Sequence, residues 1–440
     1  MARAGLWLLW LAACEPHKAP ASPAEPGPVT EHPTPRPRPA VRSCPATDKP
    51  RPVTIDPRLV LGDAAGVTWI FGYAAGDAVL AHLGLDGGLA LTRVPLHNAQ
   101  VGAVADARIW LYAPRESEVV PTRWTTIDVR DPDAPITGPV VPVKVGAKLD
   151  YADMLAVGRR RALVIVGGSG EREMVLLDPT THAAIAPPHA LGAGFEPVHA
   201  WCADDRCAVV GITDEGGGPA RRLVVIRVTA DGTREQELVA PGWIGLPHAA
   251  AHGDHVIVSW KDDDGLAVRA LDRRGHPMGP AIPVPWDSNR RIRGDTLLHA
   301  DGAVMLAVGE LGRWSVAAFG QDATPGPFRE LPGATGFLLV GAPLDDGLAW
   351  INIDGDVSYD EMGPGVMTHF WRSRAVAGFL PDSGAPTQVE LASGAGGGRG
   401  GFEPLMLVRP GAAAALVVPR DDAADFSGSV LVRLRLPCPG

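Results

Sequence analysis

The chain has 440 residues, a formal net charge of −10, 53 glycines, 43 prolines and an aromatic content of 6%. This negative balance argues against a nucleic-acid-binding protein and against a basic surface that binds anionic lipid. The abundance of glycine, proline, alanine and valine favours a turn-rich β protein over a helical bundle.

The first segment places a cation before a short apolar run and a cysteine. Arg3 precedes the run Leu6–Leu11, which ends in Leu11-Ala12-Ala13-Cys14. The eight apolar residues from Leu6 to Ala13 are too few to cross a bilayer as a helix, which needs about 20. Their length is typical of the core of a signal peptide.

This order of residues resembles the lipobox of bacterial lipoproteins. The resemblance implies that residues 1–13 are a signal peptide, removed by cleavage before Cys14, and that Cys14 then carries lipid. It also implies an outer-membrane lipoprotein of the cell envelope, on its periplasmic side or at the cell surface. No run of 18 apolar residues follows Cys14, so we expect no transmembrane helix and an anchor made of lipid alone.

Residues 14–52 have the composition of a tether. They contain twelve prolines and almost no large apolar side chain. Such a segment buries too little apolar surface to offset the entropy of ordering. We therefore expect a disordered, extended tether.

Residues 53–440 repeat a short apolar strand, a tight polar turn and a stronger apolar strand. Eight such units occur, and a further hairpin with an Asp-Gly or Gly-Gly turn follows several of them. Their second strands are expected to begin near Val67, Ile109, Ala162, Cys207, His255, Ala303, Leu348 and Ala413. Most of these starts are separated by about 40 to 50 residues, the length of a four-stranded propeller blade.

The rhythm predicts an all-β protein, a β-propeller of seven or eight four-stranded antiparallel blades over residues 53–440. It resembles the loosely repeating propellers of exported Gram-negative proteins. Leu271-Asp272 and Leu177-Asp178 are weakly similar to quinoprotein-like repeats, but their trailing Gly-x-x-x-Trp is not regular, so no quinone site is implied. WD-repeat signatures are absent. The long last interval suggests an insertion, Tyr359 to Gly401, with a flexible glycine-rich loop from Ser393.

Four cysteines remain after Cys14, and four cysteines allow three pairings. Cys202 and Cys207 bracket a tight turn, where a disulfide between neighbouring strands is easy to form. Cys44 and Cys438 lie near the two ends of the repeat region, which meet if the blades form a ring. We predict these two pairs; the alternative is that the terminal cysteines stay free or bind partners.

His248, His252 and His255 are the metal candidates of the sequence, since imidazole suits zinc or copper. They lack the glutamate and the helix of a His-Glu-x-x-His site, and a chance cluster at blade turns is the simpler interpretation. We expect no cofactor.

Two sets of tryptophans differ in their surroundings. The core is the expected place for the set on equivalent strands, Trp69, Trp110, Trp260 and Trp350. One or two of a less regular set are candidates for a glycan or peptide surface; this set is Trp243, Trp286, Trp314 and Trp371.

The predicted role is a monomeric binding or scaffolding module for an envelope protein or glycan, without catalytic residues. An enzyme acting on carbohydrate, a glycosidase or a lyase, is the first alternative, and it would bring two close carboxyl groups with shifted pKa values together. A purely structural envelope component is the second, and it would expose a wide apolar patch.

Overall fold

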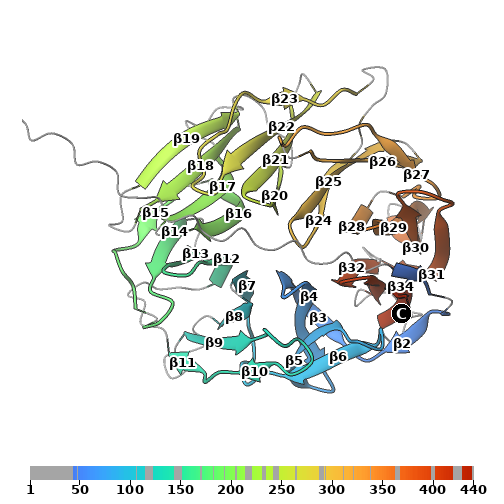
Figure 1. Cartoon of the computed structure of the whole chain (residues 1–440), viewed down its shortest axis with the longest axis horizontal. Coiled ribbons are helices and arrows are strands. Elements are labelled where there is room, and N and C mark those ends of the chain that lie inside the picture. Colours follow the sequence, from blue (N-terminus) through green and yellow to red (C-terminus); the bar gives the residue numbers. More distant parts are fainter. Residues whose placement is uncertain are drawn as a thin grey trace, which may run out of the picture. The chain divides into compact units, whose positions relative to one another are not determined.

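The computed structural model describes residues 43–438, except 47, 106, 114–121, 143–150, 169–170, 182, 193, 204–205, 214–220, 230–233, 241–246, 263–264, 287–291, 293, 311, 321, 337, 362–366, 398–401 and 420–428. Residues 40–440 belong to one unit, in which eight antiparallel sheets follow one another around a ring (Figure 1). Within the described ranges, no helix is long and apolar enough to cross a membrane.

Each sheet has its first strand nearest the centre of the ring. These inner strands are β3 (Asp56–Ala64), β7 (Val101–Ala105), β12 (Tyr151–Val157), β16 (Glu196–Ala203), β20 (His248–His252), β24 (Gly294–Ala300), β28 (Leu338–Leu344) and β32 (Phe402–Arg409). The second strands are β4 (Val67–Ala74), β8 (Arg108–Ala113), β13 (Ala162–Gly168), β17 (Arg206–Thr213), β21 (His255–Asp262), β25 (Ala303–Glu310), β29 (Gly347–Glu361) and β33 (Ala412–Pro419).

The outer half of each sheet is a second hairpin or its equivalent. The third strands are β5 (Asp77–Leu83), β9 (Arg123–Asp128), β14 (Glu171–Leu177), β18 (Arg222–Val228), β22 (Gly265–Asp272), β26 (Arg313–Ala318), β30 (Met367–Pro381) and β34 (Ser429–Pro437). The outermost strands are β6 (Leu89–Arg93), β10 (Ile136–Thr137) with β11 (Val141–Pro142), β15 (His189–Ala190), β19 (Arg234–Ala240), β23 (Ile282–Pro283), β27 (Arg329–Leu331), β31 (Thr387–Gly397) and β1 (Ser43–Pro45) with β2 (Arg51–Val53).

Eight clusters of buried apolar side chains hold the ring together, one at each junction between neighbouring sheets. The junction of the last sheet with the first is built like the others, with Leu407 and Ile70 fully buried in the same cluster. Trp69, Trp110, Trp260 and Trp350 are 0–6% exposed, as predicted. Burying one such side chain removes about 200 Å² from water, or about 5 kcal/mol of gross hydrophobic free energy.

The ring closes with strands from both ends of the chain. The order in the eighth sheet is β1-β34-β33-β32, and β2 also pairs with β34. Arg435 of β34 donates from Nε to Ser43 Oγ at 2.6 Å and from Nη2 to Asp346 Oδ2 at 3.0 Å. Its guanidinium lies 4.2 Å from the ring centre of Phe379. The sheets therefore form an eight-bladed β-propeller, which confirms the predicted fold and selects the higher blade count.

Two details differ from the sequence predictions. Residues 43–45 and 51–53 are strands of the eighth blade, although we expected the tether to extend to residue 52. The segment from Ser393 to Gly397 is the end of β31, paired with β30 from Arg374 to Phe370, and not a flexible loop. Backbone hydrogen bonds form the ladder, so a glycine-rich sequence without side-chain periodicity can still extend a long hairpin.

Candidate functional site

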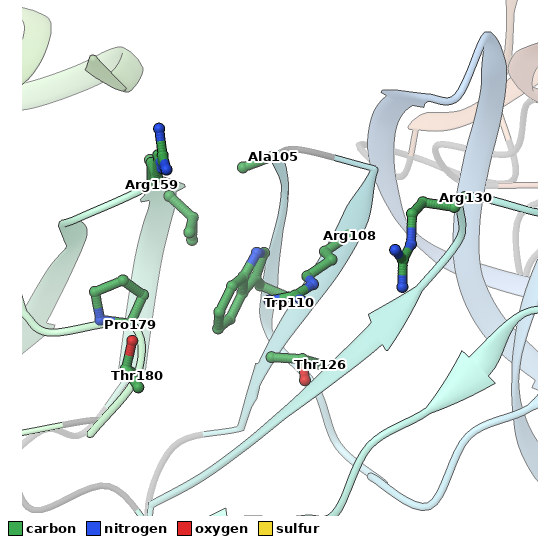
Figure 2. A pocket seen from close by; sticks show the side chains of 10 residues that line it. Ala105, Arg108, Trp110, Thr126, Arg130, Arg159, Pro179 and Thr180 are labelled. Atoms are coloured by element: carbon green, nitrogen blue, oxygen red, sulfur yellow. The ribbon is translucent and has the colours of Figure 1, made fainter. Parts of the chain in front are cut away.

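A groove of about 540 Å³ lies between the second and third blades. Its walls come from the β7–β8 and β12–β13 hairpins and from the residues that follow β9 and β14. We call it the arginine groove and define it by its lining, of which Figure 2 shows the side chains. The lining residues are Ala105, Arg108, Trp110, Thr126, Arg130, Val157, Gly158, Arg159, Pro179 and Thr180.

Two of the arginines belong to the second blade. Arg108 is the first residue of β8 and lies opposite Asp128 of β9. Arg130 follows β9 and is paired with the carboxylate of Asp128. Its Nε lies 3.0 Å from each carboxylate oxygen. Hydrogen bonding from Arg130 lowers the pKa of Asp128 to about 2. Asp128 is thus ionised and paired with Arg130. The charge of Arg108 also lowers its pKa, so two guanidinium groups share this carboxylate.

The third arginine comes from a cationic turn of the third blade. Gly158 donates its N–H to the carbonyl oxygen of Arg161 at 2.7 Å, which closes the turn between β12 and β13. This turn holds Arg159 and Arg160 exposed to solvent. Within the described part of the chain, Arg159 forms no ion pair, and the groove lining includes no acidic residue.

The floor of the groove contains an indole ring. Trp110 is 6% exposed and contacts Trp124 edge to face, with ring centres 4.9 Å apart. Its Nε1–H is buried and lacks a hydrogen-bond acceptor in the described residues. Figure 2 shows this indole between Arg159 and Arg108, with Pro179 and Thr180 on one side and Thr126 on the other.

The geometry suits an anionic group. Guanidinium groups bind carboxylates and phosphates through paired hydrogen bonds, and the lining supplies three of them. A volume of about 540 Å³ is within the range of about 300–1,000 Å³ that is usual for small-molecule sites. This groove was not predicted from the sequence. The run Arg159-Arg160-Arg161 was its one visible signal, because Arg108 and Arg130 come from another blade.

The disulfide predictions are confirmed. Cys44 and Cys438 are bonded, with Cα atoms 5.0 Å apart. Cys202 and Cys207 face each other across the β16–β17 hairpin and are also bonded, with a Cα separation of 4.0 Å. Cys14 and Trp243 lie outside the described residues, so lipidation of Cys14 stays a prediction.

The three candidate histidines do not converge on one point. His252 and His255 are neighbours across the β20–β21 turn, whereas His248 lies at the other end of β20. His248 Nε2 is 4.0 Å from Asp295 Oδ2, and His252 Nε2 is 3.4 Å from the carbonyl oxygen of Gly320. Among the residues that the structure places, no group of three or more His, Cys, Asp or Glu side chains is arranged to hold a metal.

The surface tryptophan hypothesis is wrong for Trp314. Its side chain is 4% exposed, and its Nε1 donates to the carbonyl oxygen of Gly336 at 2.7 Å. Trp286 is half-buried and contacts Phe328 edge to face. Trp371 lies in β30, in a part of the strand whose side chains are not described.

A second polar cluster lies at the opposite end of the inner strands from the arginine groove. The side chain of Asp295 is 9% exposed, and its Oδ2 has no hydrogen-bond partner among the described atoms. Burial raises the pKa of Asp295, while the charges of His248 and Lys261 oppose that rise. Among the carboxyl groups of the described ranges that have a resolved shift, Asp295 has a raised pKa and the others have a lowered one.

Histidines of two inner strands influence each other across the middle of the ring. Burial, reinforced by the charge of His299 on β24, lowers the pKa of His199 on β16 to about 4. His299 also lines a smaller hollow of about 170 Å³ together with residues of the first, seventh and eighth blades. His199 is therefore uncharged at neutral pH.

No known protein family and no curated protein matches this sequence. Among solved structures, the β-propeller domain of the trilobed protease from Pyrococcus furiosus shares 10% identity, with 78% of this chain and 98% of that chain covered and a TM-score of 0.44. AztD from Citrobacter koseri shares 13% identity, with coverages of 87% and 96% and a TM-score of 0.41. GH43B of a xyloglucan locus from Bacteroides ovatus shares 13%, with coverages of 88% and 96% and a TM-score of 0.31.

These similarities are too low to carry any function over to this chain. Its classification depends on its own strand pairing and side chains. They define an eight-bladed β-propeller with a cationic groove between its second and third blades.

Proposed function

We propose that this protein is a binding module of the cell envelope, anchored by lipid on Cys14, whose arginine groove holds an anionic group of its ligand. The single observation that supports the groove as the binding site is the excess of positive charge in it. Three arginines and no acidic residue line it, and the carboxylate of Asp128, which lies opposite Arg108, is already paired with Arg130.

That excess is unusual on this chain, which has a net charge of −10. In the unbound protein, water solvates the guanidinium groups of Arg159 and of Arg108, which shares Asp128 with Arg130. A ligand carboxylate or phosphate replaces that water with charge-assisted hydrogen bonds, each of which contributes about 1.5–3 kcal/mol. Loss of one such contact therefore weakens binding about tenfold or more.

Calorimetric titration with citrate, a compact carboxylate probe, tests the groove at low ionic strength. We expect citrate to bind the wild type and to bind the double variant Arg108→Gln/Arg159→Gln at least about tenfold more weakly. Arg93→Gln is the matched control, since Arg93 lies on the outer strand β6 and its side chain is 83% exposed. Equal binding by the wild type and the double variant would show that the groove is not the binding site.

The enzyme alternative has one observation in its favour. A buried carboxyl group with a raised pKa, such as Asp295, is the form that a general acid takes. Release of reducing sugar from envelope polysaccharide, abolished by Asp295→Asn with unchanged folding, would favour a glycosidase over a binding module. The structural alternative has less support, because the exposed large apolar residues of the described ranges are spread over five blades. They are Val60, Leu85, Leu91, Ile136, Leu238, Met278 and Leu338.

A further inference from the structure

The arginine groove restricts the class of anion that it can hold, and the inference drawn from this rests on the proposed binding function. The first restriction is size. A hollow of about 540 Å³ has the volume of about 18 water molecules in the liquid. It has room for a ring-sized group with its substituents, and a single inorganic anion would leave most of it unfilled.

The second restriction is the charge around the groove. Asp131 follows Arg130 in the chain, and Asp178 directly precedes the lining residue Pro179. The carboxylate of Asp133 does not belong to this set, because it is paired with Arg409 of the eighth blade. Hydrogen bonds from the backbone N–H groups of Thr181 and Thr180 lower the pKa of Asp178, which keeps it ionised. The charge of Arg161 also lowers the pKa of Asp178, so that carboxylate interacts with the cationic turn. Acidic side chains thus lie beside lining residues in the chain. An extended polyanion would meet them, whereas a ligand with one or two acidic groups would not.

The third restriction is the uncharged part of the lining. Thr126 and Thr180 offer hydroxyl groups, and Pro179 offers an apolar ring face. Trp110 adds the surface of its indole ring, whereas its Nε1–H is buried and not open to the groove. A bare inorganic anion would contact the guanidinium groups alone. A ring with hydroxyl groups and one carboxylate would use both parts of the lining.

The groove is also a poor site for an extended peptide. Peptides that bind sheets commonly add a strand along a free edge. Apart from Trp110 and Thr126, which lie within β8 and β9, the lining here comes from strand ends and turns. The outermost strands β10, β11 and β15 contribute no residue to it.

We infer that the ligand is an acidic saccharide and that the groove binds one uronic-acid unit of it. The carboxylate lies between Arg108 and Arg159, which flank Trp110 (Figure 2). The sugar ring lies against Pro179, and its hydroxyl groups contact Thr126 and Thr180. Arg130 remains with Asp128 and keeps that carboxylate from opposing the ligand.

The test compares four probes with the full-length, folded protein at low ionic strength: glucuronic acid, glucose, inorganic phosphate and triglutamate. We expect glucuronic acid to bind at least about tenfold more tightly than each of the others. Arg108→Gln and Arg159→Gln should each weaken the binding of glucuronic acid about tenfold, and Arg93→Gln should not change its affinity. The affinity of Arg159→Lys for glucuronic acid should lie between those of the wild type and Arg159→Gln, because lysine keeps the charge but lacks the planar, forked donor group of arginine.

Tryptophan fluorescence gives an independent readout at the groove. Binding of glucuronic acid should change the emission of the wild type, and the change should be lost in Trp110→Phe while the midpoint of thermal unfolding confirms that this variant is folded. If phosphate or triglutamate binds more tightly than glucuronic acid, the saccharide inference is wrong. The proposed function, a groove that binds an anionic group, would then still hold. If no probe binds, or if the arginine variants bind every probe as the wild type does, both the inference and the proposed function fail.

Discussion

Cys44 and Cys438 are bonded with their Cα atoms 5.0 Å apart, although 394 positions separate them in the chain. The bond lies beside the pairing of β1 with β34, where Cys44 is opposite Leu436. Two devices therefore close the ring at the same place, a backbone ladder and a covalent link. Since each blade buries its faces against its neighbours, the last junction decides whether the first and last blades are as stable as the rest.

Replacing both Cys44 and Cys438 by serine should lower the free energy of unfolding by about 2–5 kcal/mol, because the bond restricts nearly the whole unfolded chain. The matched control is Cys202→Ser with Cys207→Ser, which opens a loop with a sequence separation of 5 and should cost about 2 kcal/mol or less. Denaturant unfolding of the two double variants measures both. A larger loss from the Cys202–Cys207 pair would contradict closure by the terminal bond.

Gly378→Ala should destabilise the seventh blade. A Cβ atom at this position would lie 2.4 Å from Cζ2 of Trp350, a side chain with no solvent exposure. Overpacking of this kind costs about 1–3 kcal/mol. Thermal unfolding of the variant measures the loss, and an unchanged midpoint would show that Trp350 is less tightly held than the structure indicates.

Acid should weaken the propeller through His199. Its pKa is about 4 in the folded protein, against an ordinary value of 6.5. Between these values the unfolded chain binds the extra proton, so the free energy of unfolding falls as the pH falls from 6.5 towards 4. Above pH 6.5 both states leave His199 uncharged, so the protein loses no stability through this residue. His199→Gln should reduce the loss of unfolding free energy between pH 6.5 and pH 4 by about 2 kcal/mol, a value that allows for the partial contact of His199 with water.

Unfolding curves of His199→Gln and His299→Gln between pH 4 and 7 separate the two causes. Burial of His199 is the larger cause of its lowered pKa and the charge of His299 the smaller. The His199 variant should therefore have the larger effect. An equal effect of His299→Gln would mean that repulsion between the imidazoles, and not burial, dominates.

Cys14→Ala should release the protein from membranes or block its maturation, since the cysteine is the predicted site of lipid attachment. Fractionation of cells that express the variant and the wild type tests this. Normal maturation with unchanged membrane association would show that the lipoprotein hypothesis is wrong.

The strand pattern could be predicted closely because hairpin turns leave a local signal. The second strands at Val67, Ala162, His255 and Ala303 begin at the predicted residue. The other four begin one residue earlier than predicted. Turns that need positive φ, such as Gly66 at 75°, fix these positions in the sequence.

Contacts between blades left no such signal. Arg108 and Arg159 line one groove from two different blades, and their local sequences contain nothing that refers to the other blade. The pairing of β1 and β2 with β34 was hidden for a different reason, because Arg51-Pro52-Val53 has the composition of a tether. Composition describes what a segment can bury, and here a neighbouring strand supplies the hydrogen bonds that order it.

A crystal structure of the protein soaked with glucuronic acid tests the binding account most directly. The account predicts the sugar in the arginine groove, with its carboxylate between the guanidinium groups of Arg108 and Arg159 and its ring against Pro179. Ordered sugar in the smaller hollow beside His299, or beside Asp295, with an empty arginine groove would contradict it.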